Sequence, residues 1–365
     1  MIPFLDLGAA YKELQVQIDT AVKRVLESGQ YILGQEVETF EAEWANYCGA
    51  NYAVGVANGL DALTLALRSL DVGPGDEVIV PSNTYIATWL AVTAVGAKPV
   101  PVEPNLLTNN IEAVQIEGAI SKHTRAIIPV HLYGQPVNLD PIISLARKYN
   151  LYVIEDAAQS HGAKYKGKRI GSHGDIVCWS FYPGKNLGAM GDAGGITTNN
   201  SVLANRIKTL RNYGSEQKYC NTELGVNSRI DPIQAAILRA KLPFLDIWTN
   251  RRKAIAHRYL ADLQGTNLIL PVIPEWADPA WHLFVVRSKN RNELQKKLQD
   301  LGISTLIHYP IPPHRQIAYK SLRTTADKYP VAEQLAEEVL SLPIGPHLDI
   351  SLVETEITPS IRRCL

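Results

Sequence analysis

Apolar and polar residues alternate in two different patterns along the first half of the chain. Short apolar runs predict buried strands, and stretches in which apolar residues recur every three or four positions predict helices. The expected strands are 52–57, 77–81, 98–102, 126–131, 151–155 and 175–181. The expected helices are 10–28, 35–47, 61–69, 85–95, 113–120 and 140–149. Strands separated by helices are typical of an α/β fold with a mostly parallel sheet covered on both faces.

The alternation of expected strands and helices ends after Asn199. A helix is expected over 202–211, a polar loop over 214–228, and a long helical stretch over 232–263 that Pro243 kinks or divides. The remaining segments predict a strand in WHLFVVRS, a helix in NRNELQKKLQDLG, a strand in ISTLIHY and a helix over 331–340. We therefore expect a large α/β domain over residues 1–234 and a smaller C-terminal α+β domain over residues 235–365.

Composition excludes several classes of protein. Lys+Arg and Asp+Glu both number 36, and no basic stripe or polybasic cluster indicates a nucleic-acid or membrane-surface partner. No apolar run reaches the length of a membrane span, and the first residues, MIPFLDLGAAYKEL, do not have the pattern of a signal peptide. The four cysteines are scattered without a CxxC pair, which indicates reduced thiols in a cytoplasmic protein and neither a disulfide frame nor a metal site.

A single lysine, Lys185, follows the strand at 175–181 in the glycine-rich stretch SFYPGKNLGAMGDAGGI. Glycines allow tight turns and a close approach to a ligand. Burial in such a loop disfavours the ammonium form and lowers the pKa of a lysine. A neutral amine can attack an aldehyde, as Schiff-base enzymes require. A lone lysine is more often a plain surface residue, so this interpretation depends on its neighbours.

Other features at strand ends suit a phosphate-bearing aromatic aldehyde. Asp156 ends the strand LYVIED, where it could pair with a protonated ring nitrogen or simply cap the next turn. Gln159 could donate to a ring oxygen or be an ordinary surface residue. In VANGLDAL, Gly59 and Leu60 open a helix whose free N–H groups can bind phosphate, although a glycine before a helix is common.

Three more residues could complete such a site. Ser180 could add a hydroxyl donor for phosphate, and Asn227 could do so from a partner subunit. Tyr85 could stack on a ring, although an aromatic residue at this place is more often part of the core. The order along the chain is helix start, aromatic residue, carboxylate, serine and lysine, and this order carries more weight than any single residue.

With these residues in place, the chain resembles the sugar-nucleotide aminotransferases of the DegT/DnrJ/EryC1/StrS group, which use pyridoxal phosphate on an aspartate-aminotransferase-like fold (fold type I). The resemblance covers nearly the whole chain, through strings such as YILGQEVETFE, GPGDEVIVPSNTYIAT, VIEDAAQSHGA, SFYPGKNLGAMGDAGGI and IHYPIPPH. Within the group, FYPGKNLGAMGDAG and LIHYPIPPH look most like the enzymes that aminate carbon 3 of dTDP-3-keto-6-deoxyhexoses.

The resemblance implies pyridoxal 5′-phosphate as cofactor, glutamate as amino donor, a dTDP-keto-sugar as acceptor and a homodimer with shared sites. Lys185 then forms the Schiff base and moves protons, and Asp156 pairs with the pyridinium nitrogen. The other implied cofactor residues are Gly59, Leu60, Tyr85, Gln159, Ser180 and Asn227. The implied substrate residues are Tyr182, His308 and Tyr309 near the hexose, and Tyr219 and Arg229 near the nucleotide. Many relatives carry threonine in place of Leu60, so only its backbone contact is carried over.

Three other functions stay open at this point. Amination at C4 of the sugar is the nearest rival. A pyridoxal-phosphate-dependent sugar dehydratase has the same fold but carries histidine in place of the lysine, so Lys185 disfavours it. A non-catalytic regulator is disfavoured by the aspartate–lysine pair, the zero net charge and the lack of a DNA-reading helix.

Overall fold

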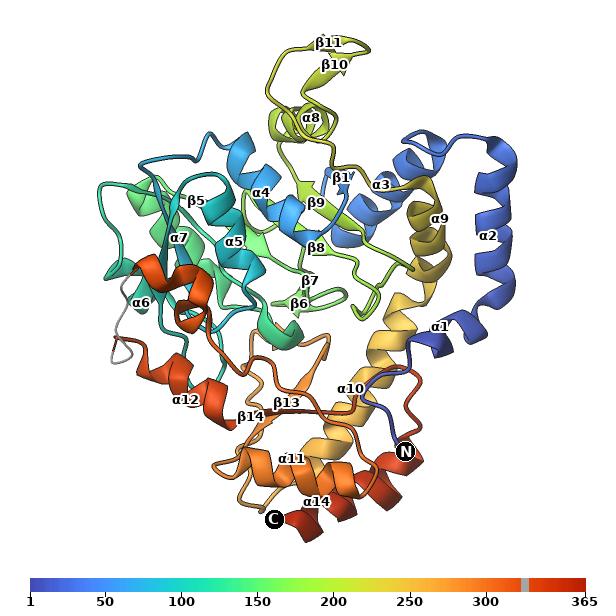
Figure 1. Cartoon of the computed structure of the whole chain (residues 1–365), viewed down its shortest axis with the longest axis vertical. Coiled ribbons are helices and arrows are strands. Elements are labelled where there is room, and N and C mark those ends of the chain that lie inside the picture. Colours follow the sequence, from blue (N-terminus) through green and yellow to red (C-terminus); the bar gives the residue numbers. More distant parts are fainter. Residues whose placement is uncertain (323–327) are drawn as a thin grey trace.

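A seven-stranded sheet forms the centre of the larger part of the molecule, in a computed structural model that describes residues 1–322 and 328–365 (Figure 1). Its strands lie in the order β1-β9-β8-β5-β4-β2-β3. Their bounds are β1 Tyr52–Val56, β2 Glu77–Pro81, β3 Lys98–Val102, β4 Thr124–Ile127, β5 Tyr152–Asp156, β8 Ile176–Ser180 and β9 Gly194–Thr198. Only β9, which the sequence pattern did not predict, runs antiparallel to its neighbours within this sheet. The predicted mostly parallel sheet is confirmed.

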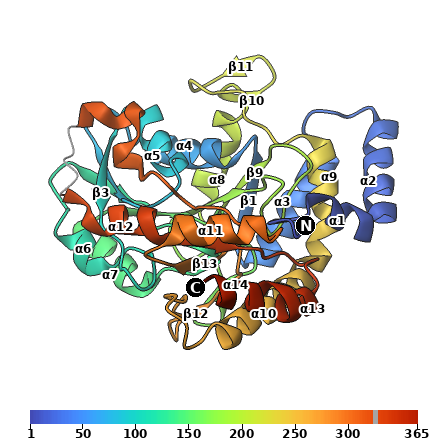
Figure 2. The ribbon, with the colours of Figure 1, turned by 60° about the horizontal axis from the view of Figure 1, so that its bottom comes forward.

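Helices cover both faces of this sheet (Figures 1 and 2). One face packs against α3 (Gln35–Cys48), α6 (Ala113–Glu117), α7 (Leu139–Tyr149) and α9 (Pro232–Lys241). The other face packs against α4 (Gly59–Ser69), α5 (Ala87–Ala94) and α8 (Ser201–Leu210). The strands are buried on both faces, and for this reason they appear in the sequence as continuous apolar runs. The two helix layers leave the carboxyl ends of the parallel strands as the edge where a ligand can bind.

The N-terminal helix predicted over 10–28 forms two helices, α1 (Leu7–Glu13) and α2 (Gln15–Ser28), separated at Leu14. Leu14 and Ile18 are buried against α9 and Trp248. Short elements complete the larger part of the chain. They are η1 (Leu132–Gly134), β6 (Lys164–Tyr165), β7 (Lys168–Arg169), β10 (Ser215–Gln217), β11 (Cys220–Asn221) and η2 (Leu242–Phe244). β6 and β7 form an antiparallel hairpin, and η2 at Pro243 separates α9 from α10 as expected.

The smaller part is built around a two-stranded antiparallel sheet of β13 (Phe284–Arg287) and β14 (Val339–Leu342). Its core is formed with α10 (Leu245–Asp262), α11 (Arg291–Asp300) and the C-terminal helices. The other elements are β12 (Ala277–Asp278), η3 (Pro313–Arg315), η4 (Ile317–Leu322), α12 (Pro330–Glu338), α13 (Ile350–Leu352), a π-helical turn (Val353–Ile357) and α14 (Thr358–Cys364). An α+β character of this part is therefore observed.

Two predictions in this part are wrong. The strand expected in ISTLIHY (303–309) is not formed; this stretch makes only isolated bridges at Ile303 and Leu306. Three prolines close behind it have no N–H to donate, which prevents a ladder from continuing. The helix expected over 331–340 ends at Glu338, and Val339 begins β14 instead. This four-residue run is fully buried and pairs with β13, so tertiary packing overrides its helical spacing.

The two-domain division remains a proposal, and its boundary needs a correction. The predicted division between residues 234 and 235 falls inside α9, whose Ala235 and Leu238 pack in the core of the large sheet. Ile255 and Tyr259 of α10 pack instead in the core of the smaller part. We therefore propose that the division lies within α10.

Candidate active site

Lys185 lies in the loop that joins β8 to β9, at the carboxyl edge of the sheet. Its backbone N–H donates to the carbonyl of Tyr182 at 2.8 Å, and Ala189 N–H donates to the carbonyl of Phe181 at 2.8 Å. A Cβ atom at Gly188 would lie 2.3 Å from the carbonyl oxygen of Pro183, so this turn needs glycine. Burial lowers the pKa of Lys185 to about 8, against a smaller opposing effect of Asp156. This shift has the direction that the sequence analysis expects for a buried lysine, and the reactivity of its amine stays a prediction.

Asp156 ends β5, as expected, and is buried. Its Oδ2 accepts a hydrogen bond from the Thr88 hydroxyl at 2.9 Å, and its Oδ1 accepts from Ala158 N–H at 3.2 Å. Burial raises the pKa of Asp156, while these hydrogen bonds and the charge of Lys185 act in the opposite direction. Each charge shifts the pKa of the other, which indicates that the side chains of Asp156 and Lys185 lie near one another.

Gln159 joins the two parts of the molecule through its amide. Its Oε1 accepts from Tyr133 N–H at 2.6 Å, and its Nε2 donates to the Tyr309 hydroxyl at 3.0 Å. The ring of Tyr309 lies against the exposed ring of Tyr85, with centroids 5.2 Å apart. The structure therefore brings Gln159, Tyr309 and Tyr85 together, and Tyr85 is not the core residue that its neighbourhood in the sequence would favour.

The start of α4 lies directly against the end of β8. A Cβ atom at Gly59 would be 2.6 Å from Cβ and 3.2 Å from Oγ of Ser180, so only glycine allows this approach. The Asn58 side chain accepts from Asp61 N–H at 2.8 Å and caps the helix, which leaves the N–H groups of Gly59 and Leu60 for another acceptor. The Leu60 side chain packs against the apolar core. The start of α4 and Ser180 thus lie together, as the expected phosphate site requires, and phosphate binding itself stays a prediction.

His308 lies beside the lysine from the side of the smaller part. Its Nδ1 is 2.8 Å from the Ser341 hydroxyl, and the ring of Phe4 packs 5.8 Å from its own ring. Burial and the charge of Lys185 lower the pKa of His308 to about 4, so the imidazole is neutral at physiological pH. Tyr182, in the lysine loop, is exposed. The charge of Lys185 thus acts on His308, Tyr309 lies with Gln159 and Tyr85, and contacts of Tyr182, His308 and Tyr309 with a sugar stay predictions.

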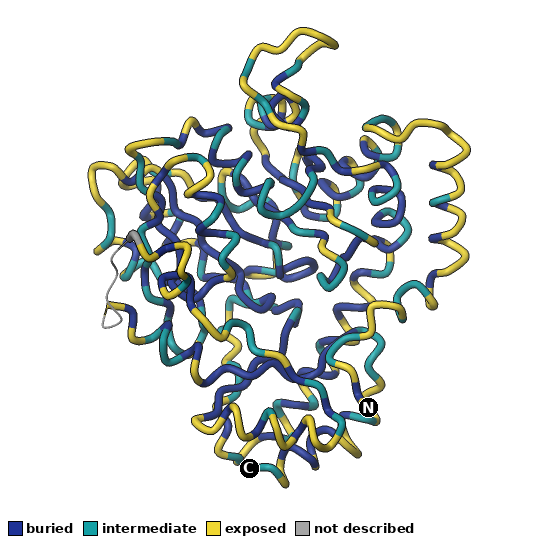
Figure 3. The backbone as a smooth tube through the Cα atoms, viewed as in Figure 1, coloured by how far each residue is buried: buried dark blue, intermediate teal, exposed yellow. Residues whose placement is uncertain are grey.

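Tyr219, predicted near the nucleotide, lies on a protruding arm, defined here as residues 212–228, and Arg229 directly follows it (Figure 1). Figure 3 shows that this arm is largely exposed. Tyr219 is 89% exposed, and Asn227 is also exposed. Arg229, at the base of the arm, donates to Asn212 Oδ1 at 2.8 Å and lies over the ring of Tyr213. A single chain does not bring Tyr219, Asn227 and Arg229 to Lys185, and their roles stay predictions.

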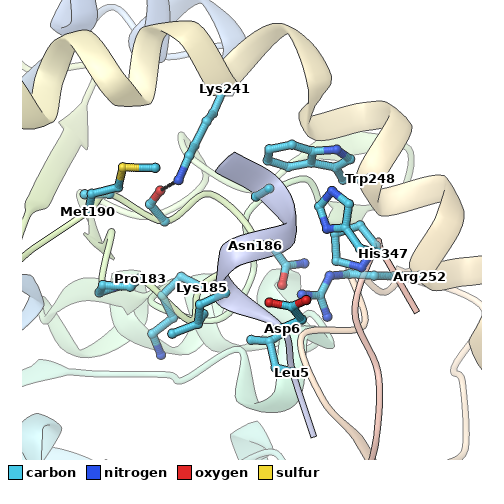
Figure 4. A pocket seen from close by; sticks show the side chains of 15 residues that line it. Leu5, Asp6, Pro183, Lys185, Asn186, Met190, Lys241, Trp248, Arg252 and His347 are labelled. Atoms are coloured by element: carbon cyan, nitrogen blue, oxygen red, sulfur yellow. Dashed lines mark hydrogen bonds between the residues drawn. The ribbon is translucent and has the colours of Figure 1, made fainter. Parts of the chain in front are cut away.

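A cavity of about 130 Å³ lies beside the lysine loop (Figure 4). Lys241 reaches it from α9 and donates to the carbonyl of Gly188 at 2.7 Å. Arg252 reaches it from α10 and donates to the carbonyls of Trp281, His282 and Ile344 at 3.2–3.3 Å. Both side chains are nearly fully buried, and burial lowers the pKa of Lys241 to about 8 and that of Arg252 to about 9. These two cations hold the loop and the neighbouring turn in place.

The residues present fit pyridoxal phosphate. An amine with a lowered pKa, a buried acid for a ring nitrogen and a glycine-opened helix start for phosphate meet at one edge of the sheet. The sequence was also compared with known proteins. The model of the DegT/DnrJ/EryC1/StrS aminotransferase family matches residues 12–357.

The chain belongs to the DegT/DnrJ/EryC1/StrS aminotransferase family.

Individual members of this family are similar over nearly the full length. The dTDP-3-amino-3,6-dideoxy-alpha-D-galactopyranose transaminase of Aneurinibacillus thermoaerophilus is 55% identical over 97% of both chains. The dTDP-3-amino-3,4,6-trideoxy-alpha-D-glucose transaminase of Streptomyces venezuelae is 54% identical over 95% of this chain and 92% of its own. The structure of S. venezuelae DesV in complex with a ketimine intermediate superposes with a TM-score of 0.98 at 52% identity, covering 99% of this chain and 98% of that one. Other structural neighbours are described with bound PMP or in a PLP form. These comparisons confirm the predicted family and fold class.

Three residues of the candidate site were not predicted from the sequence, namely Thr88, Asn186 and His282. Thr88 holds Asp156 and lies one helical turn after Tyr85, a spacing that places both near the same edge. Asn186 directly follows Lys185, and its amide Nδ2 donates to the carbonyl of Ala280 at 2.8 Å. His282 comes from the segment before β13, nearly a hundred residues later, and nothing in the local pattern connects it to the lysine loop.

Proposed function

We propose that this protein moves the amino group of glutamate to C3 of a dTDP-3-keto-6-deoxyhexose, which gives a dTDP-3-amino-3,6-dideoxyhexose and 2-oxoglutarate. The two relatives described above are named for different sugars, yet both names place the amino group at carbon 3 of a dTDP-deoxyhexose. The observation that carries the proposal is that Lys185, with its lowered pKa, and buried Asp156 are near enough for each charge to shift the pKa of the other.

Pyridoxal phosphate, when bound, supplies an aldehyde for amines and a protonated ring that acts as an electron sink. We assign the residues around it as follows. Asp156 is the counter-charge for the ring nitrogen, and Thr88 keeps its carboxylate in place. Ser180 and the N–H groups of Gly59 and Leu60 hold phosphate at the start of α4. Tyr85 lies against the ring, and Gln159 contacts its oxygen with the amide hydrogen that Tyr309 leaves free.

Lys185 is the group that handles protons. Its Nζ, as a free amine, accepts the proton that leaves the α-carbon of glutamate and can return a proton to carbon 3 of the sugar. The pKa of about 8 suits both directions, because a base and its conjugate acid are then both populated near neutral pH. The loop leaves Lys185 partly buried, which limits the access of water to its amine.

The hexose is recognised by Tyr182, His308 and Tyr309 in this proposal. Because the Ser341 hydroxyl occupies Nδ1 of His308, the other ring nitrogen, Nε2, is left to contact a sugar hydroxyl. The Tyr309 hydroxyl accepts from Gln159 and can therefore donate its own hydrogen to the substrate.

We further propose that two copies of the chain share their active sites. Apolar side chains are exposed along the arm; Leu224 is 90% and Tyr219 is 89% exposed, which favours burial against a second subunit. Asn227 would then reach the phosphate site of the other copy, and Tyr219 and Arg229 would lie near its nucleotide. Within the described residues no helix is long and apolar enough to cross a bilayer. The scattered cysteines, which are all free, fit a reducing compartment, and we propose a cytoplasmic enzyme.

The experiment that tests this function uses purified protein with pyridoxal phosphate, glutamate and either a dTDP-3-keto- or a dTDP-4-keto-6-deoxyhexose. The product is analysed by NMR to locate the new amine, and Lys185→Ala protein is the control. We expect amine at C3 from the 3-keto sugar only. An amine at C4 would assign the rival aminotransferase activity, loss of a hydroxyl without amination would assign a dehydratase, and no reaction with either sugar would favour a regulator.

A further inference from the structure

The loop that carries Lys185 is tied to the smaller part of the molecule by one side chain, Asn186. Its Nδ2 donates to the carbonyl of Ala280 at 2.8 Å, and its Oδ1 lies 3.3 Å from Nδ1 of His282. A carbonyl oxygen can only accept, so the bond to Ala280 fixes which end of the amide is the nitrogen. The amide oxygen then also accepts, and Nδ1 of His282 must carry the hydrogen of this bond.

This assignment fixes the tautomer of His282. Burial, together with the charges of Lys185 and Arg252, moves the pKa of His282 well below its ordinary value, so the ring is neutral. A neutral imidazole with its hydrogen on Nδ1 keeps a lone pair on Nε2. Asn186 therefore receives a hydrogen bond that does not change with protonation over the physiological pH range.

The turn that holds Asn186 is itself rigid and strained. Trp281, between the two contacting residues, has φ of 50° and is buried, a backbone conformation that non-glycine residues rarely adopt. Arg252 holds the turn by donating to the carbonyls of Trp281 and His282. Gly134 packs against it so closely that a Cβ atom there would lie 2.9 Å from His282 N and 3.0 Å from the carbonyl oxygen of Gln159. The turn thus contacts Asn186 on one side and Gly134 on the other, and Gly134 in turn lies close to Gln159.

We propose that Asn186 and His282 form a positioning pair that holds the Lys185 amine in its desolvated place and couples it to the smaller part of the molecule. Neither residue needs to touch the cofactor or the substrate for this role. The inference rests on the proposed role of Lys185 but concerns the state of its amine, which can be measured without cofactor. The ionisable groups that face Lys185 are Asp156, His161, His282 and His308.

The test measures the ionisation of Lys185 in the protein without cofactor. Its reductive methylation is followed by peptide mass spectrometry from neutral to alkaline pH, and only the free amine reacts. In the unchanged protein we expect half-maximal reaction near pH 8. In His282→Ala, water enters and the loop loosens, so the midpoint should rise by about one pH unit. In His282→Gln, whose amide still donates to Asn186, the midpoint should stay near that of the unchanged protein.

Asn186→Ala should raise the midpoint as His282→Ala does, and Asn105→Ala is its matched control. Asn105 also uses both ends of its amide, donating to Glu112 at 3.0 Å and accepting from Leu107 N–H at 2.8 Å, in a loop away from the lysine. Thermal melting shows whether each variant is folded. If Asn186→Ala does not fold, the two His282 variants alone test the proposal. An unchanged midpoint in folded His282→Ala, or the same rise in Asn105→Ala or His282→Gln, would overturn the proposal. Failure of the proposed function shows itself differently, as protein that never binds the cofactor.

Discussion

The hydroxyl of Thr88 donates a hydrogen bond to Oδ2 of Asp156 at 2.9 Å, inside the protein and one helical turn after Tyr85. Both residues are buried, and Thr84 lies 2.9 Å from Thr88 through their hydroxyl oxygens. A buried carboxylate is costly unless such donors surround it, and here they oppose the effect of burial on its pKa. The start of α5 therefore determines how well Asp156 can act as a counter-charge.

Replacing Thr88 with valine keeps the shape of the side chain and removes the hydroxyl. We expect the variant to bind pyridoxal phosphate about tenfold more weakly, which corresponds to about 1.4 kcal/mol, the range of one hydrogen bond to a charged group. Cofactor affinity is measured by absorbance titration. Thr93→Val, in the last turn of the same helix, is the control, because Thr93 contacts Tyr319 and Trp89 and not Asp156. Equal affinities for Thr88→Val and the unchanged protein would contradict this role.

Asp156→Asn removes the charge that opposes the ring nitrogen but keeps an acceptor for Thr88. The variant should still bind the cofactor, since the phosphate residues are intact, while turnover falls by about 10²–10³. Turnover is measured with glutamate and the keto-sugar under saturating cofactor. Asp175→Asn is a control in the same sheet, since Asp175 accepts from Val153 N–H at its edge. Unchanged turnover in Asp156→Asn would show that the charge of Asp156 is not needed for the reaction.

The lowered pKa of Lys185 predicts how cofactor loading depends on pH. Burial disfavours the ammonium, so the free amine becomes populated as the pH rises through about 8. The rate at which the cofactor-free protein gains the visible absorbance of lysine-bound pyridoxal phosphate should therefore rise through that pH and level off above it. A rate that keeps increasing until about pH 10.4 would indicate an ordinary surface lysine instead.

Shared active sites can be tested by mixing two inactive variants. Lys185→Ala lacks the amine, and Asn227→Ala lacks the phosphate contact proposed to come from the other subunit. In a mixed dimer one site would carry both changes and the other neither, so mixed and re-equilibrated subunits should regain roughly a quarter of the original activity. Mixing each variant with itself is the control. No gain over these controls, or monomeric protein in sedimentation, would contradict the proposed dimer.

The sequence predicted the large sheet well because its strands are buried on both faces and its helices are amphipathic. Glu77–Pro81 and Lys98–Val102, for example, have the same bounds in the structure as in the prediction. The same patterns failed where distant contacts decide. Val339 leaves the helix because β13 offers it a partner, and residues 303–309 do not form a strand because prolines follow.

In the candidate site, too, the residues marked by local pattern could be predicted and those defined by distant contacts could not. Asp156, Ser180 and Gly59 could be named because they lie at strand ends and a helix start, and Gln159 and Lys185 because they follow such strands within a few residues. Thr88, Asn186 and His282 could not, since their roles depend on single hydrogen bonds to residues far away in the sequence. Local pattern therefore identifies the candidates for the reacting groups, and the fold is needed to find the residues that hold them.

The most direct test of the central claim locates the cofactor on the chain. Purified protein is loaded with pyridoxal phosphate, reduced with borohydride and digested, and the labelled peptide is identified by mass spectrometry. We predict a single pyridoxyl group on Lys185, and none on Lys241, whose amine has a similarly lowered pKa but is held by the carbonyl of Gly188. A label on another lysine, or no stable label at all, would contradict the account.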